Sequence, residues 1–383
     1  MNARERFLNT LSYGERDRVP LIDLGFWKET IEVWHEQGLP KDVDNRNADE
    51  YFETDGFWNY YLSPEQTDGG GLCDRGMVVP EALRIGLAPF FETNVIEDCG
   101  DQEVVQIADG TRVRRHKSMG SIPLHEGYLL EDKDSWNKYY KTRLNPDSPE
   151  RYPSDWSKLD AIANNPDRDH LLMLPAGSLY GWIRNWMGLE EISYLIYDDE
   201  ELFEEMLETI TECVCGVLKK TLERGGKYDA AFYWEDMSYN GGPLISPTHF
   251  KNFMVPKYKQ INALLNSFGV SNIIVDSDGR VDDLIPHWLD AGVNCVLPFE
   301  IGTTGADPIN YRKKFGRDMR MIGGFDKRIL SGSTEGIDRE IKRLAPLVEE
   351  GGFLPTCDHK IPPDVSMANY QHYLASAKKM WGV

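Results

Sequence analysis

One unit recurs in the second half of this sequence: a short apolar run with a polar or acidic end, followed by a stretch with helical spacing. The clearest copy is Ser271–Gly279, where an Ile-Ile-Val run leads into Asp276 and Asp278. Two further runs, Tyr228–Asp236 and Val293–Glu300, also end in acids. Strands that alternate with helices form parallel sheets, whose carboxyl ends meet at one edge. The repetition therefore predicts an α/β fold whose chemistry lies at that edge.

Counting these units predicts a (β/α)8 TIM barrel, in which eight strand–helix units close on themselves. We predict strands at 19–24, near 53–62, and at 170–175, 228–234, 271–276, 293–299, 319–323 and 352–356. We predict helices at 2–17, 190–224, and about 247–267, 281–291, 307–315, 334–349 and 366–381. Residues 102–115 alternate around Asp109-Gly110, a strong hairpin signal. We therefore predict one domain, 1–383, with an antiparallel hairpin insertion at about 64–169.

Composition narrows the class of partner. A formal net charge of −21 disfavours nucleic acid and anionic membranes, because the mean field of the protein repels them. No run approaches the roughly 18 apolar residues of a membrane span, and the first residues lack a signal-peptide pattern, so we expect a cytoplasmic protein. The six cysteines form no CxxC pair, so neither a disulfide framework nor a zinc ribbon is predicted. We expect a small-molecule ligand, and a homodimer is compatible with the sequence.

The strongest candidate site residues follow predicted strands. Asp276 and Asp278 point the same way, because side chains alternate along a strand. A turn with local Asx hydrogen bonds is the alternative for this pair. His359 follows the last predicted strand, and neutral imidazole is a common metal ligand. Cys357 lies beside it, although a lone cysteine after an apolar run is more often a packing residue.

Further acids and aromatic residues complete the candidate set. Glu235 is a candidate acid, base or ligand, with helix capping as the alternative, and Asp236 is a weaker candidate. Two adjacent acids after Phe-Tyr-Trp need partners if they are buried. Glu300 is expected to bind substrate. A flat pocket for an aryl or tetrapyrrole ligand, or alternatively ordinary core, is predicted for four aromatic residues: Trp27, Tyr180, Trp182 and Trp186.

Several stretches of the chain form a set: Arg4–Leu8 followed by Asp17–Pro20, Trp234–Met237 with Gly242–Pro247 and Phe250, the 271–279 run, and Gly351–Asn369. Together they resemble the uroporphyrinogen decarboxylase superfamily. The resemblance spans nearly the whole chain. It implies a TIM barrel and one of two activities, decarboxylation of uroporphyrinogen or zinc-dependent methyl transfer linked to a corrinoid. As a set, these motifs indicate the superfamily more strongly than they indicate the reaction.

Departures from the family patterns bear on the reaction. In the decarboxylases an arginine-bearing segment after the first strand helps hold the substrate carboxylates, and Asp23–Lys28 lacks it. In the methyltransferases a His-x-Cys-Gly segment carries metal ligands where this chain reads Asp276-Ser-Asp-Gly279. The resemblance therefore implies a metal site, with zinc as the expected ion, formed from Asp276, Asp278, Cys357 and His359. His359 also matches a late histidine of the decarboxylases.

These observations favour a corrinoid-dependent methyltransferase. The expected reaction removes a methyl group from a small donor, an aryl methyl ether or a methylated amine, with a metal acting as Lewis acid. The cobalamin or related corrinoid is expected on a separate corrinoid-binding protein, and Glu235 or His359 is expected to protonate the departing oxygen. Two alternatives stay open: uroporphyrinogen decarboxylase, or a non-catalytic barrel that binds a ligand or the corrinoid partner.

Overall fold

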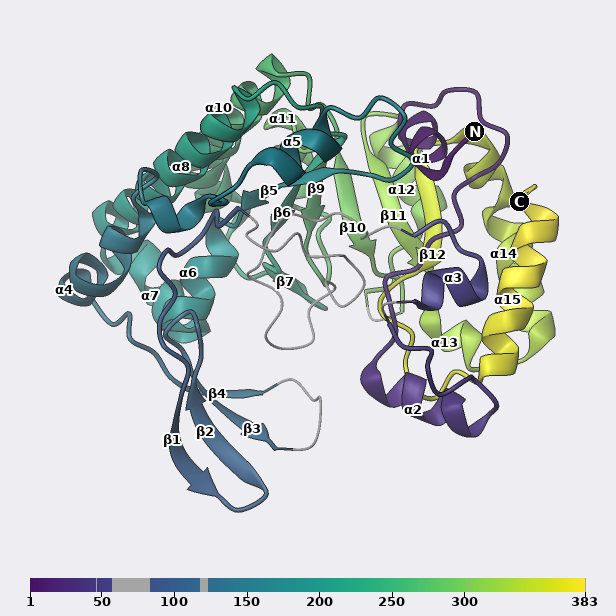
Figure 1. Cartoon of the computed structure of the whole chain (residues 1–383), viewed down its shortest axis with the longest axis horizontal. Coiled ribbons are helices and arrows are strands. Elements are labelled where there is room, and N and C mark those ends of the chain that lie inside the picture. The colour runs from purple at the N-terminus through teal and green to yellow at the C-terminus, as the bar shows by residue number, and fades with distance from the viewer. Residues whose placement is uncertain (46, 57–82, 118–122, 303, 383) are drawn as a thin grey trace.

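A parallel sheet of six strands forms the centre of the molecule, seen in a computed structural model that describes residues 1–45, 47–56, 83–117, 123–302 and 304–382 (Figure 1). The strand order is β12-β11-β10-β9-β6-β5. The bounds are β5 Met173–Gly177, β6 Ala230–Trp234, β9 Ile273–Asp276, β10 Cys295–Phe299, β11 Arg320–Phe325 and β12 Phe353–Cys357. These six confirm the predictions at 170–175, 228–234, 271–276, 293–299, 319–323 and 352–356.

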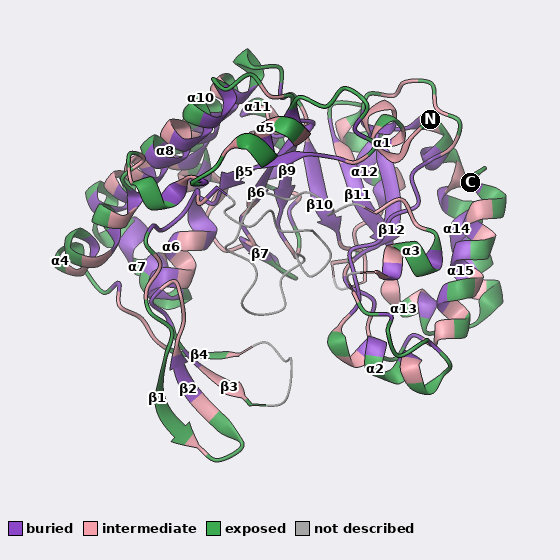
Figure 2. Ribbon diagram, in the orientation of Figure 1, coloured by how far each residue is buried: buried purple, intermediate pink, exposed green. Residues whose placement is uncertain are grey.

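The strands are apolar along their length because both faces of the sheet are covered. On one face Phe232, Ile274 and Leu297 belong to a small interior cluster. That cluster also takes Ile22 and Leu24 from the amino-terminal segment, and Phe7 and Leu11 from the first helix. The opposite face packs against the helices, and Figure 2 shows the strands and the inner sides of those helices as buried. One face of the sheet therefore has a small apolar cluster of its own, to which the first helix contributes.

Helices flank the sheet on both sides (Figure 1). Their bounds are α1 Ala3–Leu11, α2 Lys28–Glu36, α3 Ala48–Phe52, α4 Lys133–Ser135, α5 Ser157–Ala163, α6 Tyr180–Met187, α7 Leu189–Asp198, α8 Glu200–Leu222, α9 Pro247–His249, α10 Val255–Ser267, α11 Ile285–Asp290, α12 Pro308–Phe315, α13 Lys327–Leu330, α14 Thr334–Glu350 and α15 Met367–Met380. Shorter 3₁₀ or π segments lie at Trp136–Tyr140, Lys141–Leu144, Pro149–Arg151 and Phe250–Met254. Among the described residues, none of these helices combines the length and apolar character that a membrane crossing requires.

A separate antiparallel sheet confirms the predicted hairpin. Its order is β1-β2-β3-β4, with bounds Asn94–Cys99, Gln102–Gln106, Arg112–His116 and Leu124–Gly127. β2 and β3 pair across the turn that contains Asp109 and Gly110. Gly110 has a φ of 89°, and a Cβ there would lie 2.8 Å from the Tyr140 hydroxyl, so the position requires glycine. A small two-stranded ribbon, β7 Ser238–Tyr239 with β8 Gly242–Pro243, follows β6.

The prediction of a first strand at 19–24 is wrong, because these residues form no strand in the structure. The segment is buried and extended, but only Phe26 forms a bridge, to Ile361, and the Gly25 carbonyl accepts from the Ile361 N–H at 2.8 Å. Local bonding competes with a ladder here, because the Asp23 carboxylate accepts from the N–H of Gly25 at 2.8 Å. The strand predicted near 53–62 lies mostly outside the described residues. Residues 53–56 are not a strand.

The long helix predicted at 190–224 is two helices, α7 and α8. Asp199 separates them, and its side chain accepts a hydrogen bond from the N–H of Leu202 at the start of α8. Aspartate at this position caps a new helix rather than continuing the old one. The first helix, predicted at 2–17, ends at Leu11.

A buried carboxylate ties the first helix to the sheet. Asp229, just before β6, accepts from Arg4 of α1 at 2.8 Å and from Arg168 at 2.8 Å. It also accepts from the N–H of Leu172, just before β5, at 2.9 Å. The side chains of Arg168 and Asp229 are almost completely buried, so each ion depends on the other for compensation.

We predict that Asp229→Asn lowers the free energy of unfolding by about 3 kcal/mol, because it leaves the Arg168 guanidinium buried without its counter-ion. Urea unfolding followed by circular dichroism measures the change. The matched control is Asp147→Asn, which breaks an exposed pair with Lys220 and should cost less than about 1 kcal/mol. Equal costs for the two variants would contradict a structural role for the buried pair.

Candidate active site

Polar residues from neighbouring strands gather at the carboxyl edge of the sheet. Asp236 follows β6, Asp276 ends β9, Asp278 lies two residues later, and Glu300 follows β10. Lys327 begins α13 after β11, and His359 follows β12. Electrostatic interactions link Asp278 with Asp236, Glu300 and Lys327, and link His359 with Glu300, Lys327 and Asp236. The predicted convergence of strand ends is therefore present, and this edge is the candidate active site.

Asp276 is the most deeply placed acid of this group. Its backbone carbonyl accepts from the N–H groups of Glu235 at 2.8 Å and Asp236 at 3.2 Å, which holds the two strand ends in register. The residue is 5% exposed. Because Ile274 faces the interior cluster, alternation places the Asp276 side chain above it, beside Trp234. Burial, followed by the charges of Asp278, Asp236 and Glu300, raises the pKa of Asp276 well above its usual value.

Asp278 lies nearer the solvent and forms the closest acid–imidazole pair of the site. Its Oδ2 is 3.8 Å from Nε2 of His359. Desolvation, together with the charges of Asp236 and Glu300, raises the pKa of Asp278 to about 7. Burial and the nearby Lys327 ammonium lower the pKa of His359 to about 4. At neutral pH the imidazole is therefore uncharged, and Asp278 can both hold and release a proton.

A glycine fixes the turn between these acids. Gly279 has a φ of 85°, and a Cβ there would come within 2.8 Å of the backbone of Ser238 and Tyr239. Its N–H donates to Oε2 of Glu300 at 2.8 Å. Asp278 and Gly279 therefore form a turn, as the alternative interpretation of this pair predicts, and this turn lies at the candidate active site.

Two cations of the described chain, Arg184 and Lys327, form ion pairs with the strand-end acids. Nη2 of Arg184 lies 2.8 Å from Oδ2 of Asp236, whose backbone φ is 42°. Nζ of Lys327 lies 3.3 Å from Oε1 of Glu300. Although burial opposes it, the charges of Asp358 and Glu300 raise the pKa of Lys327. Sequence reasoning missed Arg184 and Lys327. The position of Lys327, first in the helix after a strand, was the only available signal for it.

Asp358 is a further residue that sequence reasoning missed. Its side chain is completely buried and accepts from the N–H groups of Ile301 at 3.0 Å and Gly302 at 3.1 Å. It also accepts from the N–H of Lys327 at 3.0 Å. Asp358 therefore joins the loop after β10 to the start of α13, and so positions Lys327 and Glu300 for each other.

Glu235 does not face a substrate, which corrects the prediction of an acid, base or ligand. The residue is completely buried. Its carboxylate accepts from the N–H groups of Leu179 at 2.8 Å, Tyr180 at 2.9 Å and Gly181 at 3.1 Å, at the start of α6. It also accepts from the hydroxyls of Ser178 at 3.2 Å and Tyr258 at 2.6 Å. A carboxylate saturated by five donors holds the helix start, as the helix dipole favours.

The four predicted pocket aromatics separate into core and site. Tyr180 and Trp186 are buried in the main core, so their prediction as ligand-contacting residues is wrong. Trp182 is half-buried and stacks on Trp186 at 5.9 Å. Trp27 is half-buried and stacks on the His359 ring, with centroids 5.8 Å apart and planes 18° apart. Trp27 is therefore the aromatic of this set that borders the acid–imidazole pair.

The four predicted zinc ligands do not form one cluster: Asp276, Asp278 and His359 share the carboxyl edge, but Cys357 is turned away from it. Cys357 is 1% exposed and belongs to the main core on the helix side of β12, because Leu354 of the same strand faces the interior. Burial and the charge of Asp358 raise the pKa of its thiol well above the usual value, which disfavours the thiolate that zinc requires. Among the described residues, no group of three or more His, Cys, Asp or Glu side chains is arranged to hold a metal ion. The donor set thus does not fit zinc in this arrangement.

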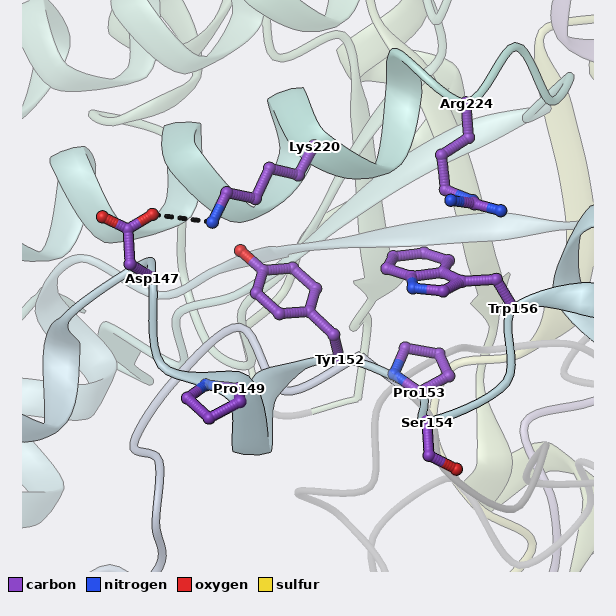
Figure 3. Close-up of a pocket in the computed structure, with 8 residues that line it drawn as sticks. All are labelled: Asp147, Pro149, Tyr152, Pro153, Ser154, Trp156, Lys220 and Arg224. Atoms are coloured by element: carbon purple, nitrogen blue, oxygen red, sulfur yellow. Dashed lines mark hydrogen bonds and ion pairs between the residues drawn. The ribbon is translucent and has the colours of Figure 1, made fainter.

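A surface cavity lies elsewhere, between α8 and residues 147–156 (Figure 3). Its volume is about 570 Å³, and its rim carries two basic side chains over aromatic rings. Lys220 lies over Tyr152 at 5.0 Å and Arg224 over Trp156 at 4.4 Å. Lys220 is paired with Asp147 at 2.7 Å, and Arg224 is paired with Asp160. The cavity contains none of the strand-end acids, so it is not the candidate active site.

Comparisons with known proteins support the family resemblance and the fold. The family model described as uroporphyrinogen decarboxylase (URO-D) matches residues 184–380. A uroporphyrinogen decarboxylase of Syntrophotalea carbinolica (strain DSM 2380 / NBRC 103641 / GraBd1) is 25% identical over 190 residues, which are 49% of this chain and 50% of that protein. The chain thus matches about half the length of this curated relative. A methyltransferase from Methanosarcina mazei aligns over 99% of both chains with a TM-score of 0.60 and 13% identity, which shows a shared fold.

The raised pKa of Asp278 predicts a pH-dependent stability. Below its unfolded pKa near 4 the carboxyl is protonated in both states, and between about 4 and 7 the folded state binds the extra proton. The contribution of Asp278 to the free energy of unfolding should therefore fall as pH rises from about 4 to 8. The free energy of unfolding of Asp278→Asn should rise by about 1 to 2 kcal/mol relative to that of wild type between pH 4 and pH 8, because the amide does not titrate. The change is smaller than the full pKa shift implies, because part of the Asp278 side chain is exposed and its charge is screened.

Urea unfolding at pH 4, 6 and 8 measures this difference. The control is Asp290→Asn on the surface of α11, where Lys259 lowers the pKa of the carboxyl instead. This variant should therefore not reproduce the rise relative to wild type between pH 4 and pH 8 that is expected for Asp278→Asn. A constant difference between Asp278→Asn and wild type at all three pH values would contradict the raised pKa.

Proposed function

Because this chain belongs to the uroporphyrinogen decarboxylase family, we propose that it is a methyltransferase that demethylates a small donor and passes the methyl group to a corrinoid on a separate protein. One observation carries the proposal. The two cations that reach the strand-end acids, Arg184 and Lys327, are each bound to a carboxylate of the chain. Among the described residues, this edge offers a surplus of acids rather than the cations that a polycarboxylate substrate requires.

The same proposal includes the architecture that such a site requires. We propose that the sheet closes as a (β/α)8 barrel within one domain, 1–383, with an insertion at about 64–169. The interior cluster supports closure, because Ile22 and Leu24 pack in it with residues of the six strands. The Phe26–Ile361 bridge supports it at the carboxyl edge. In a barrel, a donor bound at the strand ends sits where a partner protein can reach it.

The chain's own residues bind the donor and manage its charge. Trp27 and His359 form a stacked wall at one side of the site. Asp278, with a pKa of about 7, is partly protonated at neutral pH, so its protonated form can donate to an oxygen that departs from an ether donor. A methylated amine needs no such proton, since a positively charged nitrogen leaves as a neutral amine. A reduced corrinoid, when docked, supplies the electron pair that takes up the methyl group. The corrinoid partner and the donor are both parts of the proposal.

Decarboxylation of uroporphyrinogen is the second candidate, favoured by the name of the curated relative and of the family model. It requires cations to hold substrate carboxylates and to stabilise developing charge. A non-catalytic barrel that binds a ligand or the corrinoid partner is the third. Formation of coproporphyrinogen by the purified protein would establish the second candidate and overturn the first. Absence of turnover with every donor and with uroporphyrinogen would leave the third.

We predict that the purified protein forms methylcobalamin from cob(I)alamin and a small methyl donor, followed by the absorbance change of the corrinoid. His359→Ala should lower the rate at least about 10-fold. The substitution removes the imidazole ring that lies beside Asp278 and stacks on Trp27. The control is His372→Ala on the surface of α15, whose imidazole lies 2.9 Å from Asp338 away from the site. Equal rates for both variants would contradict the assigned site.

The family resemblance implies zinc, but the roles proposed for Trp27, His359 and Asp278 do not require an ion. Metal content of protein purified without chelator tests it, in wild type, Asp278→Ala and His359→Ala. About one zinc per chain in wild type, lost in both variants, would show that these side chains close around an ion despite the arrangement described. We expect well under one, because Cys357 packs in the core and cannot join Asp276. The same residues then act in proton transfer and binding.

A further inference from the structure

The candidate active site contains two carboxyl groups that form no ion pair with an arginine or lysine of the described chain. Arg184 is bound to Asp236 and Lys327 to Glu300, which leaves Asp276 and Asp278. His359 does not compensate them at neutral pH, because burial keeps its imidazole uncharged. A positively charged ligand bound beside these two groups would favour their ionised forms.

Asp276 shows that one of these groups lacks its partner. Its side chain is more than nine-tenths buried and faces the interior, and no described residue donates a hydrogen bond to it. Thr356, which faces the same interior from β12, also has a buried Oγ1 without a partner. Buried polar atoms are nearly always hydrogen-bonded, since an unmet group costs about 1 to 3 kcal/mol. A group outside the described chain is therefore expected to complete this site.

Three other buried acids make the contrast clear. Asp229, Glu235 and Asp358 each accept at least three hydrogen bonds from arginine, backbone or hydroxyl donors. Each of the three joins two segments of the chain, so its burial has a structural explanation. Asp276 joins segments only through its backbone carbonyl. Its carboxyl group has no such structural role among the described residues.

The surroundings suit an organic cation. The indole of Trp234 packs against the interior cluster and is paired with Asp276 across the sheet. The Arg184 guanidinium lies 5.7 Å from its ring centre, so a ligand cation would share this ring with Arg184. Trp27 has the Lys360 ammonium 5.2 Å from its ring centre. Indole rings are the best aromatic partners for cations, and aromatic rings recognise quaternary and methylated ammonium groups. A compact metal ion would instead need several converging ligands, which the described residues do not provide.

We propose that Asp276 binds the positively charged nitrogen of the substrate, and that the methyl donor is a methylated ammonium compound rather than a neutral aryl ether. The identity of the bound cation as a methyl donor rests on the proposed function; its binding does not. In the transfer, the carbon–nitrogen bond breaks and its electron pair stays on nitrogen. The electron pair of the reduced corrinoid forms the new bond to the methyl carbon, and a neutral amine leaves without any proton being consumed.

Calorimetry with choline and 3,3-dimethylbutan-1-ol tests the charge requirement, because the two molecules differ mainly in the exchange of a cationic nitrogen for carbon. We expect wild type to bind choline at least 10-fold more tightly than the alcohol. Asp276→Asn should weaken choline binding at least 10-fold and leave the alcohol unchanged. Asp290→Asn, the same substitution on the surface of α11, should change neither. Equal affinity of wild type for both molecules, or loss of binding in neither variant, would overturn the proposal.

The wild-type comparison decides the matter even if Asp276→Asn fails to fold, which a thermal melt would reveal. A transfer assay with choline and with methoxybenzene separates this inference from the proposed function. Transfer from methoxybenzene alone would support methyl transfer and overturn the cationic donor. Choline binding that depends on Asp276, without transfer from either compound, would support the cation site and overturn the proposed function.

Discussion

The alternation of side chains along buried parallel strands decides which polar groups reach the candidate active site. Ile274 faces the interior cluster, so Asp276 opens into the site above it. On β12 the same rule turns Leu354 inward and Cys357 into the shell of helices. Two residues that lie close to the site in sequence can therefore belong to opposite faces of the sheet. A donor set deduced from sequence proximity alone cannot include this constraint.

Buried acids in this protein serve two purposes. Asp229, Glu235 and Asp358 are surrounded by donors, and they fasten helix α1, helix α6 and the loop after β10. Asp276 is buried and the half-buried Asp278 lies beside it; desolvation, together with the other acids nearby, raises the pKa of both. Protein folds rarely keep such an arrangement for stability, since each uncompensated group is costly. Its position at the carboxyl ends of parallel strands is where α/β proteins bind ligands.

The fold itself leaves the reaction open. The chain shares its architecture with a methyltransferase from Methanosarcina mazei, and its family carries the name of a decarboxylase. One barrel supports many chemistries, because its activity depends on side chains at the strand ends. Here the decisive feature is electrostatic: Arg184 and Lys327 are both engaged by acids of the chain. That balance of charge favours a small neutral or cationic substrate over a polycarboxylate.

The sequence by itself determined the repeated strand–helix units, the Asp109-Gly110 hairpin and the gathering of Asp276, Asp278, Glu300 and His359 at one edge. These features depend on local patterns of apolar residues, turns and strand ends, which are readable along the chain. Local bonding by Asp23 and capping by Asp199 altered two predicted elements, because short polar side chains compete with the backbone ladder.

Only the tertiary structure decided which acids are satisfied. The donors around Glu235 come from the start of α6 and from Tyr258, and Arg184 approaches Asp236 from a helix about fifty residues earlier in the chain. Whether a buried carboxylate is saturated or left without a donor depends on groups that folding brings from distant segments. For that reason Glu235 belongs to the framework, and Asp276 to the site.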